Sequence, residues 1–248
     1  MSFLNKVVVV TGSSSGIGAA TAKEFSKEGA HVVIVGRNEE KLKNVRDQCD
    51  NVGKEPLVLV ADITKEDEAK SVIDKTITTY GKLDVLVNNA GMSREVDILD
   101  KNFMEDYDRI ITLNLRSAVY LTHLAIPHLI VTKGNIVNIS SAFAKIHVAN
   151  AIPYCTSKAG LNHFTKCVAA RLAPLNIRVN IVSPGPVRTD ILENSGMTNY
   201  TWDMVGETTP LKRVSEPEEI AETVLFLASE KAKSITGADY AVDNGTTL

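Results

Sequence analysis

The chain has 248 residues and a formal net charge of −3, with 44% hydrophobic and 23% charged residues. This length and composition suit one large globular α/β domain and exclude a disordered or fibrous protein. The slight acidic excess, with Lys and Arg spread among acids, also argues against a nucleic-acid-binding surface, which is usually basic.

The sequence carries no sign of membrane contact or of a metal. No apolar run approaches the roughly 18 residues that a membrane-spanning helix needs. The apolar N-terminal residues continue directly into Thr11–Gly18 without a cleavage pattern, which favours a first strand over a signal segment. Three cysteines without CxxC spacing indicate reduced thiols, and the histidines show no zinc pattern. We therefore expect a cytoplasmic protein without a metal site.

Short β-branched runs alternate with helix-length segments along the chain. The expected strands, in chain order, are Lys6–Val10, His31–Val35, Leu57–Ala61, Asp84–Val87, Asn135–Ile139, Arg178–Val182 and Ala238–Val242. The clearest helices are Ile17–Glu28, Glu66–Tyr80 and Tyr154–Arg171, and the candidate helix-stop residues are Gly29, Gly53 and Gly81. Because most strand runs are continuously apolar, they predict strands that are covered on both faces. The alternation predicts a single-domain, Rossmann-like α/β fold: a doubly wound parallel sheet of about seven strands with helices on both faces.

Residues 186–216 contain the longest stretch without clear periodicity. Large apolar side chains are interleaved there with Gly and Pro, namely Leu192, Met197, Tyr200, Trp202 and Met204. A disordered insertion has little use for such side chains, so we expect this segment to be a lid over an apolar substrate pocket. The alternative is that it packs on the core or on a neighbouring subunit.

A glycine-rich loop joins the first expected strand to the first helix. It reads Thr11-Gly12-Ser13-Ser14-Ser15-Gly16-Ile17-Gly18. Glycine permits a tight turn and lets backbone N–H groups approach a pyrophosphate at the helix N-terminus. The loop lacks the Lys of a P-loop, which argues against an NTPase. The alternative is a Gly/Ser-rich turn that binds nothing.

Tyr154 and Lys158 are four residues apart in an expected helix, so their side chains share one face. Ser140 and Ser141 follow the strand Asn135–Ile139, at the edge where open parallel sheets bind ligands. A free phenol has a pKa of about 10, and we expect the Lys158 ammonium to lower the pKa of Tyr154. Serine at a strand end also commonly closes a turn, which is the structural alternative.

Together these motifs resemble the short-chain dehydrogenase/reductase family, in its shorter branch, over nearly the whole chain. The motifs stand in family order: TGSSSGIG at 11–18, Asp62, Asn88-Asn89-Ala90-Gly91, Asn114, Ser141, the Tyr154–Lys158 pair, Pro184-Gly185 with Thr189, and the closing Thr236–Asp239 and Val242-Asp243. The resemblance implies a nicotinamide-dependent oxidoreductase that interconverts a carbonyl and an alcohol. The family's serine-to-tyrosine interval points to Ser141 rather than Ser140.

The resemblance also implies a role for each matching residue. The expected catalytic residues are Asn114, which supports a water linked to Lys158, Ser141, which holds the substrate oxygen, Tyr154, the acid/base, and Lys158, which also binds the nicotinamide ribose. The expected cofactor-binding residues are Gly12, Ser14, Ser15, Gly16, Ile17, Gly18, Arg37, Asp62, Ile63, Asn89, Ala90, Gly91, Tyr154, Lys158, Pro184, Gly185, Val187 and Thr189. Alternatives remain for Asp62, which would reach the adenine or simply cap the next helix, and for Asn114 as an ordinary helix residue.

The end of the second expected strand bears on the choice of cofactor. It reads Val35-Gly36-Arg37-Asn38, whereas NAD enzymes usually carry an acid there for the ribose 2′-hydroxyl. Gly36 occupies the place where the family's NAD-preferring members resemble one another in having Asp. Arg37 offers a planar, permanently charged fork suited to phosphate. We therefore expect NADP(H) to be favoured over NAD(H). Ser15 departs from this pattern, because many NADP-preferring relatives carry a second basic residue there, and Arg37 has the alternative of an exposed helix-start arginine.

The expected function is an NADP(H)-dependent carbonyl reductase or alcohol dehydrogenase. A dinucleotide-binding redox sensor and a structural or assembly protein are the alternatives, but neither needs the full catalytic set. The small-molecule substrate is left open among steroid, isoprenoid, fatty, aromatic and 3-oxoacyl thioester carbonyl compounds. The resemblance implies a homo-oligomer, a tetramer or a dimer, built on the helices that contain Asn114 and Tyr154.

Overall fold

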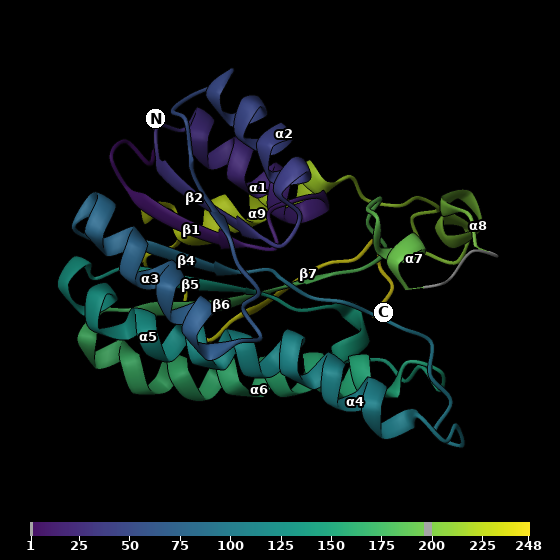
Figure 1. Cartoon of the computed structure of the whole chain (residues 1–248). Helices are drawn as coiled ribbons and strands as arrows, with labels where there is room; N and C mark the ends of the chain where they lie inside the picture. The colour runs from purple at the N-terminus through teal and green to yellow at the C-terminus, as the bar shows by residue number, and fades with distance from the viewer. Residues whose placement is uncertain (1, 196–199) are drawn as a thin grey trace.

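A single parallel sheet forms the centre of the computed structural model, which describes residues 2–195 and 200–248. Its strand order is β3-β2-β1-β4-β5-β6-β7, as Figure 1 shows. The strands are β1 (Val7–Thr11), β2 (His31–Gly36), β3 (Leu57–Val60), β4 (Val85–Asn88), β5 (Asn135–Ile139), β6 (Arg178–Pro184) and β7 (Asp239–Val242). The predicted fold is confirmed, and the largest difference at a strand end is at β6, which continues to Pro184.

Helices cover both faces of this sheet (Figure 1). The layer on one face consists of α1 (Gly16–Lys27), α2 (Glu39–Asp50) and α9 (Pro217–Ala228). The layer on the other face consists of α3 (Glu66–Tyr80), α5 (Ser117–Thr132) and α6 (Ile152–Leu172), with α4 (Phe103–Ile111) beside α6. No helix among the described residues is both long enough and apolar enough to cross a membrane.

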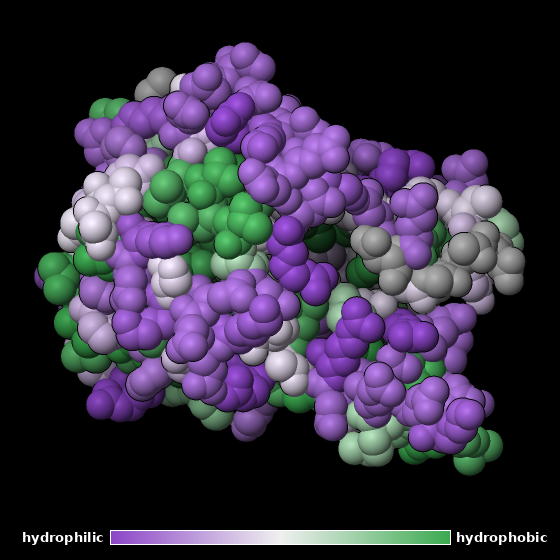
Figure 2. Space-filling view, in the orientation of Figure 1, coloured by the Kyte–Doolittle hydropathy of each residue, from purple (hydrophilic) through white to green (hydrophobic). Residues whose placement is uncertain are grey.

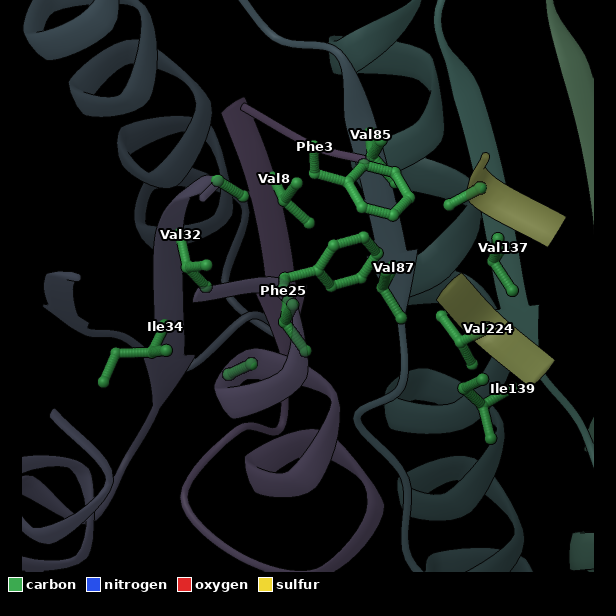
Figure 3. Close-up of a cluster of buried hydrophobic side chains, with 14 of the residues drawn as sticks. Phe3, Val8, Phe25, Val32, Ile34, Val85, Val87, Val137, Ile139 and Val224 are labelled. Atoms are coloured by element: carbon green, nitrogen blue, oxygen red, sulfur yellow. The ribbon is translucent and has the colours of Figure 1, made fainter. Parts of the chain in front are cut away.

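The continuous apolar runs feed two cores, because successive strand residues point to opposite faces of the sheet. In β1, Val8 and Val10 face the α1 and α9 side, whereas Val7 and Val9 face the α3 and α5 side. Figure 3 shows the first core, in which Phe25 of α1 lies among side chains of four strands and α9. The residues labelled there are Phe3, Val8, Phe25, Val32, Ile34, Val85, Val87, Val137, Ile139 and Val224.

Two of the three expected helix-stop glycines act in that way. Gly29 and Gly81 adopt left-handed φ values of 87° and 72° directly after α1 and α3, which is the conformation that ends many helices. The prediction for Gly53 is wrong, because α2 already ends at Asp50 with Asn51 as its C-cap. A Cβ on Gly53 would lie 2.1 Å from the Ser26 carbonyl oxygen. Glycine is needed there because the chain runs against the end of α1.

The two ends of the segment expected to be a lid are joined to each other just beyond the sheet. Val187 and Ser215 form an isolated bridge, held by hydrogen bonds from Arg188 N to Ser215 O (2.9 Å) and from Ser215 N to Pro186 O (3.0 Å). Between them lie α7 (Ile191–Asn194) and α8 (Trp202–Glu207), beyond the carboxyl ends of the strands (Figure 1). Leu192 and Trp202 are half-buried, Tyr200 and Met204 are exposed, and Met197 lies outside the described residues.

Candidate active site

A cleft lies at the carboxyl ends of the strands, next to β1 and β4, where the strand order changes direction. Open α/β sheets bind ligands at this position. Figure 2 shows the hollow on this face, with an apolar floor between hydrophilic rims. The expected site residues that line it are Gly12, Ser14, Ser15, Gly16, Ile17, Arg37, Asp62, Ile63, Asn89, Ala90, Gly91, Ser141, Tyr154, Lys158, Pro184, Gly185, Val187 and Thr189.

The glycine-rich loop forms one wall of the cleft and leads directly into α1. Gly12 and Gly16 adopt left-handed φ values of 64° and 54°, which only glycine takes at little cost. A Cβ on Gly12 would lie 2.7 Å from Ala90 Cα, so a side chain would push the loop from β4. Ser15 is the N-cap of α1 but makes no side-chain cap hydrogen bond. The first turn of α1 therefore presents N–H groups that an anion can accept from.

Two of the expected cofactor-binding residues, Asn89 and Gly18, hold the glycine-rich loop in its position. Asn89 Nδ2 donates to the carbonyl oxygens of Thr11 (2.9 Å) and Gly12 (3.1 Å), which fixes the loop against β4. Gly18 does not line the cleft: a Cβ there would lie 2.3 Å from Gly12 O. Gly18 therefore allows α1 to pack closely on the loop.

The far rim of the cleft carries an exposed cation. Arg37 is exposed and makes no ion pair or side-chain hydrogen bond among the described residues. Gly36 lies beside Ser14, so that a Cβ on Gly36 would be 3.3 Å from Ser14 Cβ. An acidic side chain at position 36 would crowd the loop as well as repel a phosphate. The rim thus offers a positive charge and no carboxylate at this position.

Asp62 lies on the same rim, where it closes a turn. Its Oδ1 accepts hydrogen bonds from Thr64 N (3.1 Å) and Thr64 Oγ1 (2.7 Å). Burial acts to raise the pKa of Asp62, but these hydrogen bonds and the charge of Arg37 together lower it. The alternative of a helix cap is wrong, because Lys65 is the N-cap of α3.

Ser141, Tyr154 and Lys158 meet at the end of β5. Ser141 Oγ accepts a hydrogen bond from Phe143 N (3.1 Å), which begins the short turn Ala142–Ala144, and the Phe143 ring lies edge-on to the Tyr154 ring, with 6.0 Å between the centroids. Ser140 instead donates to the Lys158 carbonyl oxygen at 3.3 Å. Of the two serines, Ser141 is the one whose hydroxyl acts on the phenol, because it tends to lower the pKa of Tyr154.

Burial dominates the electrostatics of this group. It raises the pKa of Tyr154, and the Ser141 hydroxyl acts in the opposite direction without cancelling this effect. Burial also lowers the pKa of Lys158 to about 8. Lys158 Nζ lies 5.7 Å from the Tyr154 ring centroid and donates to Ile139 O at 2.9 Å. Among the protein's own groups, burial thus sets the direction of the Tyr154 pKa, and the lowering expected from Lys158 together with a nicotinamide ring stays a prediction.

Asn114 is buried behind this group, in a π-helical turn (Thr112–Arg116) between α4 and α5. Its Nδ2 donates to Met92 O (2.9 Å) and Ser157 Oγ (3.1 Å), and its Oδ1 accepts from Met92 N (2.9 Å). π-Helical turns are rare and are often found at functional sites. Asn114 is thus no ordinary helix residue: it ties the chain after β4 to α6, although it does not line the cleft.

The residues that follow β6 form a further wall of the cleft. Gly185 packs against β7, since a Cβ there would lie 2.7 Å from Asp243 Cα. Thr189 reaches back across the cleft to the glycine-rich loop, and a Cβ on Gly16 would lie 2.8 Å from Thr189 Cγ2. No group of three or more His, Cys, Asp or Glu side chains in the described ranges is placed to hold a metal ion.

Known proteins with this architecture are similar in sequence to this chain over nearly its whole length. A family model described as enoyl-(acyl carrier protein) reductase matches residues 12–247. A short-chain dehydrogenase/reductase of Caenorhabditis elegans, solved with cofactor, superposes with a TM-score of 0.93 at 36% identity, covering 100% of this chain and 97% of that one. The chain belongs to the short-chain dehydrogenase/reductase family.

Two curated members of this family are similar to the chain to nearly the same degree. The 3-oxoacyl-[acyl-carrier-protein] reductase of Thermotoga maritima is 35% identical over 98% of each chain. The L-fucose dehydrogenase of Bos taurus is 34% identical over 99% of this chain and 91% of its own. Both are oxidoreductases by name, so the expected class of enzyme is confirmed, but their names give different substrates.

Several residues at this short-chain dehydrogenase/reductase site were missed by sequence reasoning. The cleft is also lined by Val35, Ala61, Met92, Ser93, Arg109, Leu113, Ile139, Asp190 and Ile191, besides Gly36 and Ser140, which were weighed above. Most adjoin an expected residue in sequence, which was the available signal. Arg109 had none, because its position at the cleft depends on how α4 lies beside α6.

Sequence reasoning also missed a buried row of hydrogen-bonded polar side chains beneath the cleft. Asn88 Nδ2 donates to Asn138 Oδ1 at 2.8 Å, and Asn138 Nδ2 donates to Thr165 Oγ1 at 2.8 Å. This row links β4, β5 and α6 directly below the proposed site. Buried polar groups that are paired in this way favour one arrangement of the elements that carry them.

Proposed function

We propose that the protein is an NADP(H)-dependent oxidoreductase that interconverts a carbonyl and a secondary or primary alcohol, with Tyr154 as the acid/base. The observation that carries this proposal is the cluster at the end of β5, where Ser141, Tyr154 and Lys158 line the same cleft and Lys158 Nζ lies 5.7 Å from the Tyr154 ring centroid. A non-catalytic redox sensor or an assembly protein has no need of this cluster.

The shape and charge of the cleft fit a dinucleotide. The left-handed turns at Gly12 and Gly16 lead the loop into the first turn of α1, where backbone N–H groups can bind a pyrophosphate and no N-cap side chain competes. Asp62 and Ile63 would bound the adenine, and Pro184, Gly185, Val187 and Thr189 the nicotinamide. Arg37 would hold the 2′-phosphate that distinguishes NADP from NAD, since its guanidinium is otherwise unpaired among the described residues.

The proton chemistry follows from the environment of Tyr154. When bound, the nicotinamide cofactor supplies or accepts the hydride. Because burial raises the pKa of Tyr154, its phenol is protonated at neutral pH and can donate a proton to the oxygen of a carbonyl undergoing reduction. Ser141 can hydrogen-bond the same oxygen and hold it against the phenol. In oxidation the phenolate is needed, and the neighbouring Lys158 ammonium favours its formation.

The substrate that we propose is apolar. Leu192, Tyr200, Trp202 and Met204 lie on the segment between Val187 and Ser215, next to the cleft, and Tyr200 and Met204 are exposed rather than packed on the core. We propose that this segment acts as a lid. The two curated relatives do not select a substrate, because their names refer to an acyl thioester and a sugar.

We also propose that the protein is cytoplasmic and forms a homo-oligomer, a tetramer or a dimer, through α4, α5 and α6. Met104 on α4 and Val131 on α5 are 59% and 82% exposed, so both helices present an apolar side chain that a second copy of the chain could cover.

The proposed function is tested by following oxidation of NADPH and NADH in parallel across a panel of steroid, isoprenoid, fatty, aromatic and 3-oxoacyl thioester carbonyl compounds. We expect turnover with NADPH that is lost in Tyr154→Phe, a change that removes only the hydroxyl. Tyr107→Phe on α4, outside the cleft lining, is the matched control and should retain activity. Equal activity of wild type and Tyr154→Phe would overturn the mechanism.

A further inference from the structure

Asp239, the first residue of β7, binds three other elements through one carboxylate. Its Oδ1 accepts from Ser183 Oγ of β6 at 2.6 Å. Its Oδ2 accepts from Asn162 Nδ2 of α6 at 3.1 Å and lies 3.1 Å from Lys145 Nζ. The Asp239 side chain is only 12% exposed. Hydrogen bonds to a charged, largely buried acceptor are stronger than neutral ones and less weakened by solvent.

Each partner of Asp239 adjoins a residue of the proposed active site. Lys145 is the C-cap of the turn Ala142–Ala144, whose N-cap is Ser141. Ser183 directly precedes Pro184, which lines the cleft. Asn162 lies four residues after Lys158, one turn further along the same face of α6.

The turn after Ser141 is tied to the sheet by this anchor. Its own hydrogen bonds are local: Ala144 N to Ser141 O (3.0 Å), Lys145 N to Ala142 O (2.9 Å) and Ile146 N to Ala142 O (3.3 Å). Its first residues also pack on α6, where the Phe143 ring lies edge-on to the Tyr154 ring and Ala142 is buried. The Lys145–Asp239 ion pair adds a charged link from the end of the turn to β7.

We propose that Asp239 is a positioning residue: by holding Lys145, Ser183 and Asn162 together, it fixes Ser141 relative to Tyr154 and Lys158. This inference rests on the proposed oxidoreductase function. It does not require Asp239 to touch the substrate or the cofactor, and Asp239 is not among the residues that line the cleft.

The kinetic test uses Asp239→Asn, which removes the charge but little volume, and Lys145→Met, which removes one of the three links. Misplacement of a reacting group by a fraction of an ångström reduces the rate of the chemical step, so we expect Asp239→Asn to lower kcat about tenfold. The Kd for NADPH should change much less than kcat, because the glycine-rich loop, which would hold the pyrophosphate, is untouched. The double variant should lose no more kcat than Asp239→Asn, because both changes break the same link. Asp239→Glu, which keeps a carboxylate, should recover part of kcat.

The matched controls are Asp74→Asn and Lys70→Met, which break an exposed ion pair on α3 and should leave kcat unchanged. A merely structural role for Asp239 would lower the melting temperature while kcat per NADPH-binding site stayed at the wild-type value. That result, or a kcat for Lys145→Met equal to wild type, would overturn the proposal.

A second readout is independent of turnover. Hydrogen exchange measured by mass spectrometry should show faster exchange at residues 142–146 in Lys145→Met and unchanged exchange in β2. Unchanged exchange at residues 142–146 would overturn the anchoring role. If no panel substrate is turned over by wild type, the proposed function fails, whereas the exchange measurement still reports whether Asp239 holds the turn.

Discussion

Lys41 on α2 and Asp190 at the start of α7 form an ion pair, with 2.6 Å between Nζ and Oδ2, although 149 residues separate them in sequence. The hydrogen bond with Asp190 raises the pKa of Lys41. This contact joins the rim that carries Arg37 to the segment that carries Thr189, on opposite sides of the cleft. A dinucleotide in the cleft would lie beneath it.

Breaking this ion pair should speed the release of the cofactor. Half-exposed pairs contribute up to about 1 kcal/mol, so we expect Lys41→Met and Asp190→Asn each to raise the dissociation rate of NADPH about threefold. The same factor is expected for NADH, because the pair acts through the lid. The measurement is stopped-flow displacement, with Lys43→Met, which pairs only within α2, as the control. An effect of Lys41→Met on NADPH alone would show instead that Lys41 binds the 2′-phosphate.

Arg37 should determine the preference for NADP(H). Hydrogen bonds to charged groups contribute about 1.5–3 kcal/mol each, so Arg37→Ser should lower kcat/KM for NADPH by about 10- to 100-fold. The value for NADH should change little. Arg46→Ser, at a half-exposed arginine further along α2, is the control. A wild-type enzyme that prefers NADH would refute our interpretation of Gly36 and Arg37.

The pH dependence should report the buried lysine. Burial lowers the pKa of Lys158 to about 8, so the ammonium is lost as the pH rises through that value. Because kcat/KM for NADPH reflects groups of the cofactor-free enzyme, it should fall above about pH 8. In Lys158→Arg the cation persists, and the fall should move to higher pH. A profile that is identical in the two proteins would contradict this assignment.

The buried charge of Lys158 should also lower the free energy of unfolding. Below about pH 8 Lys158 is charged in both the folded and unfolded states, and burial of that charge is unfavourable by about 3 kcal/mol. Lys158→Met removes this cost but also the hydrogen bond to Ile139 O, worth about 1 kcal/mol, so its free energy of unfolding should rise by about 2 kcal/mol at neutral pH. Between about pH 8 and pH 10.5 only folded wild type has released the proton, which stabilises it as the pH rises.

The advantage of Lys158→Met should therefore shrink across that pH range. Urea unfolding at neutral pH and near pH 10 measures both values. Lys166→Met, an exposed lysine two turns further along α6, is the control and should show no such trend. A lower stability of Lys158→Met at neutral pH would contradict the expectation.

The fold could be predicted because its signals are local. Continuous apolar strands such as Val7–Thr11 and the glycines at Gly12 and Gly16 act through neighbouring residues. The role of Gly53 could not be predicted in this way, because the contact that requires glycine there is with Ser26 of another helix. Sequence spacing alone could not distinguish these two uses of glycine.

The site could be predicted only as far as its motifs extend. The characteristic spacing in the sequence identifies Ser141, Tyr154 and Lys158. Asp239 and Asp190, by contrast, meet their partners only when distant segments pack together. The pKa of Tyr154 went unpredicted because it depends on how completely the phenol is buried, which no motif records.

The bridge between Val187 and Ser215 has a consequence for how this enzyme can change. Both ends of the intervening segment are fixed at one place by two backbone hydrogen bonds, next to the sheet. The entropic cost of closing a loop grows slowly with its length, so a longer or shorter segment can be inserted between these two points at little cost to folding. New substrates can thus be acquired by exchanging the part of this segment beyond Thr189, while the glycine-rich loop and the proposed Ser141, Tyr154 and Lys158 cluster stay in place.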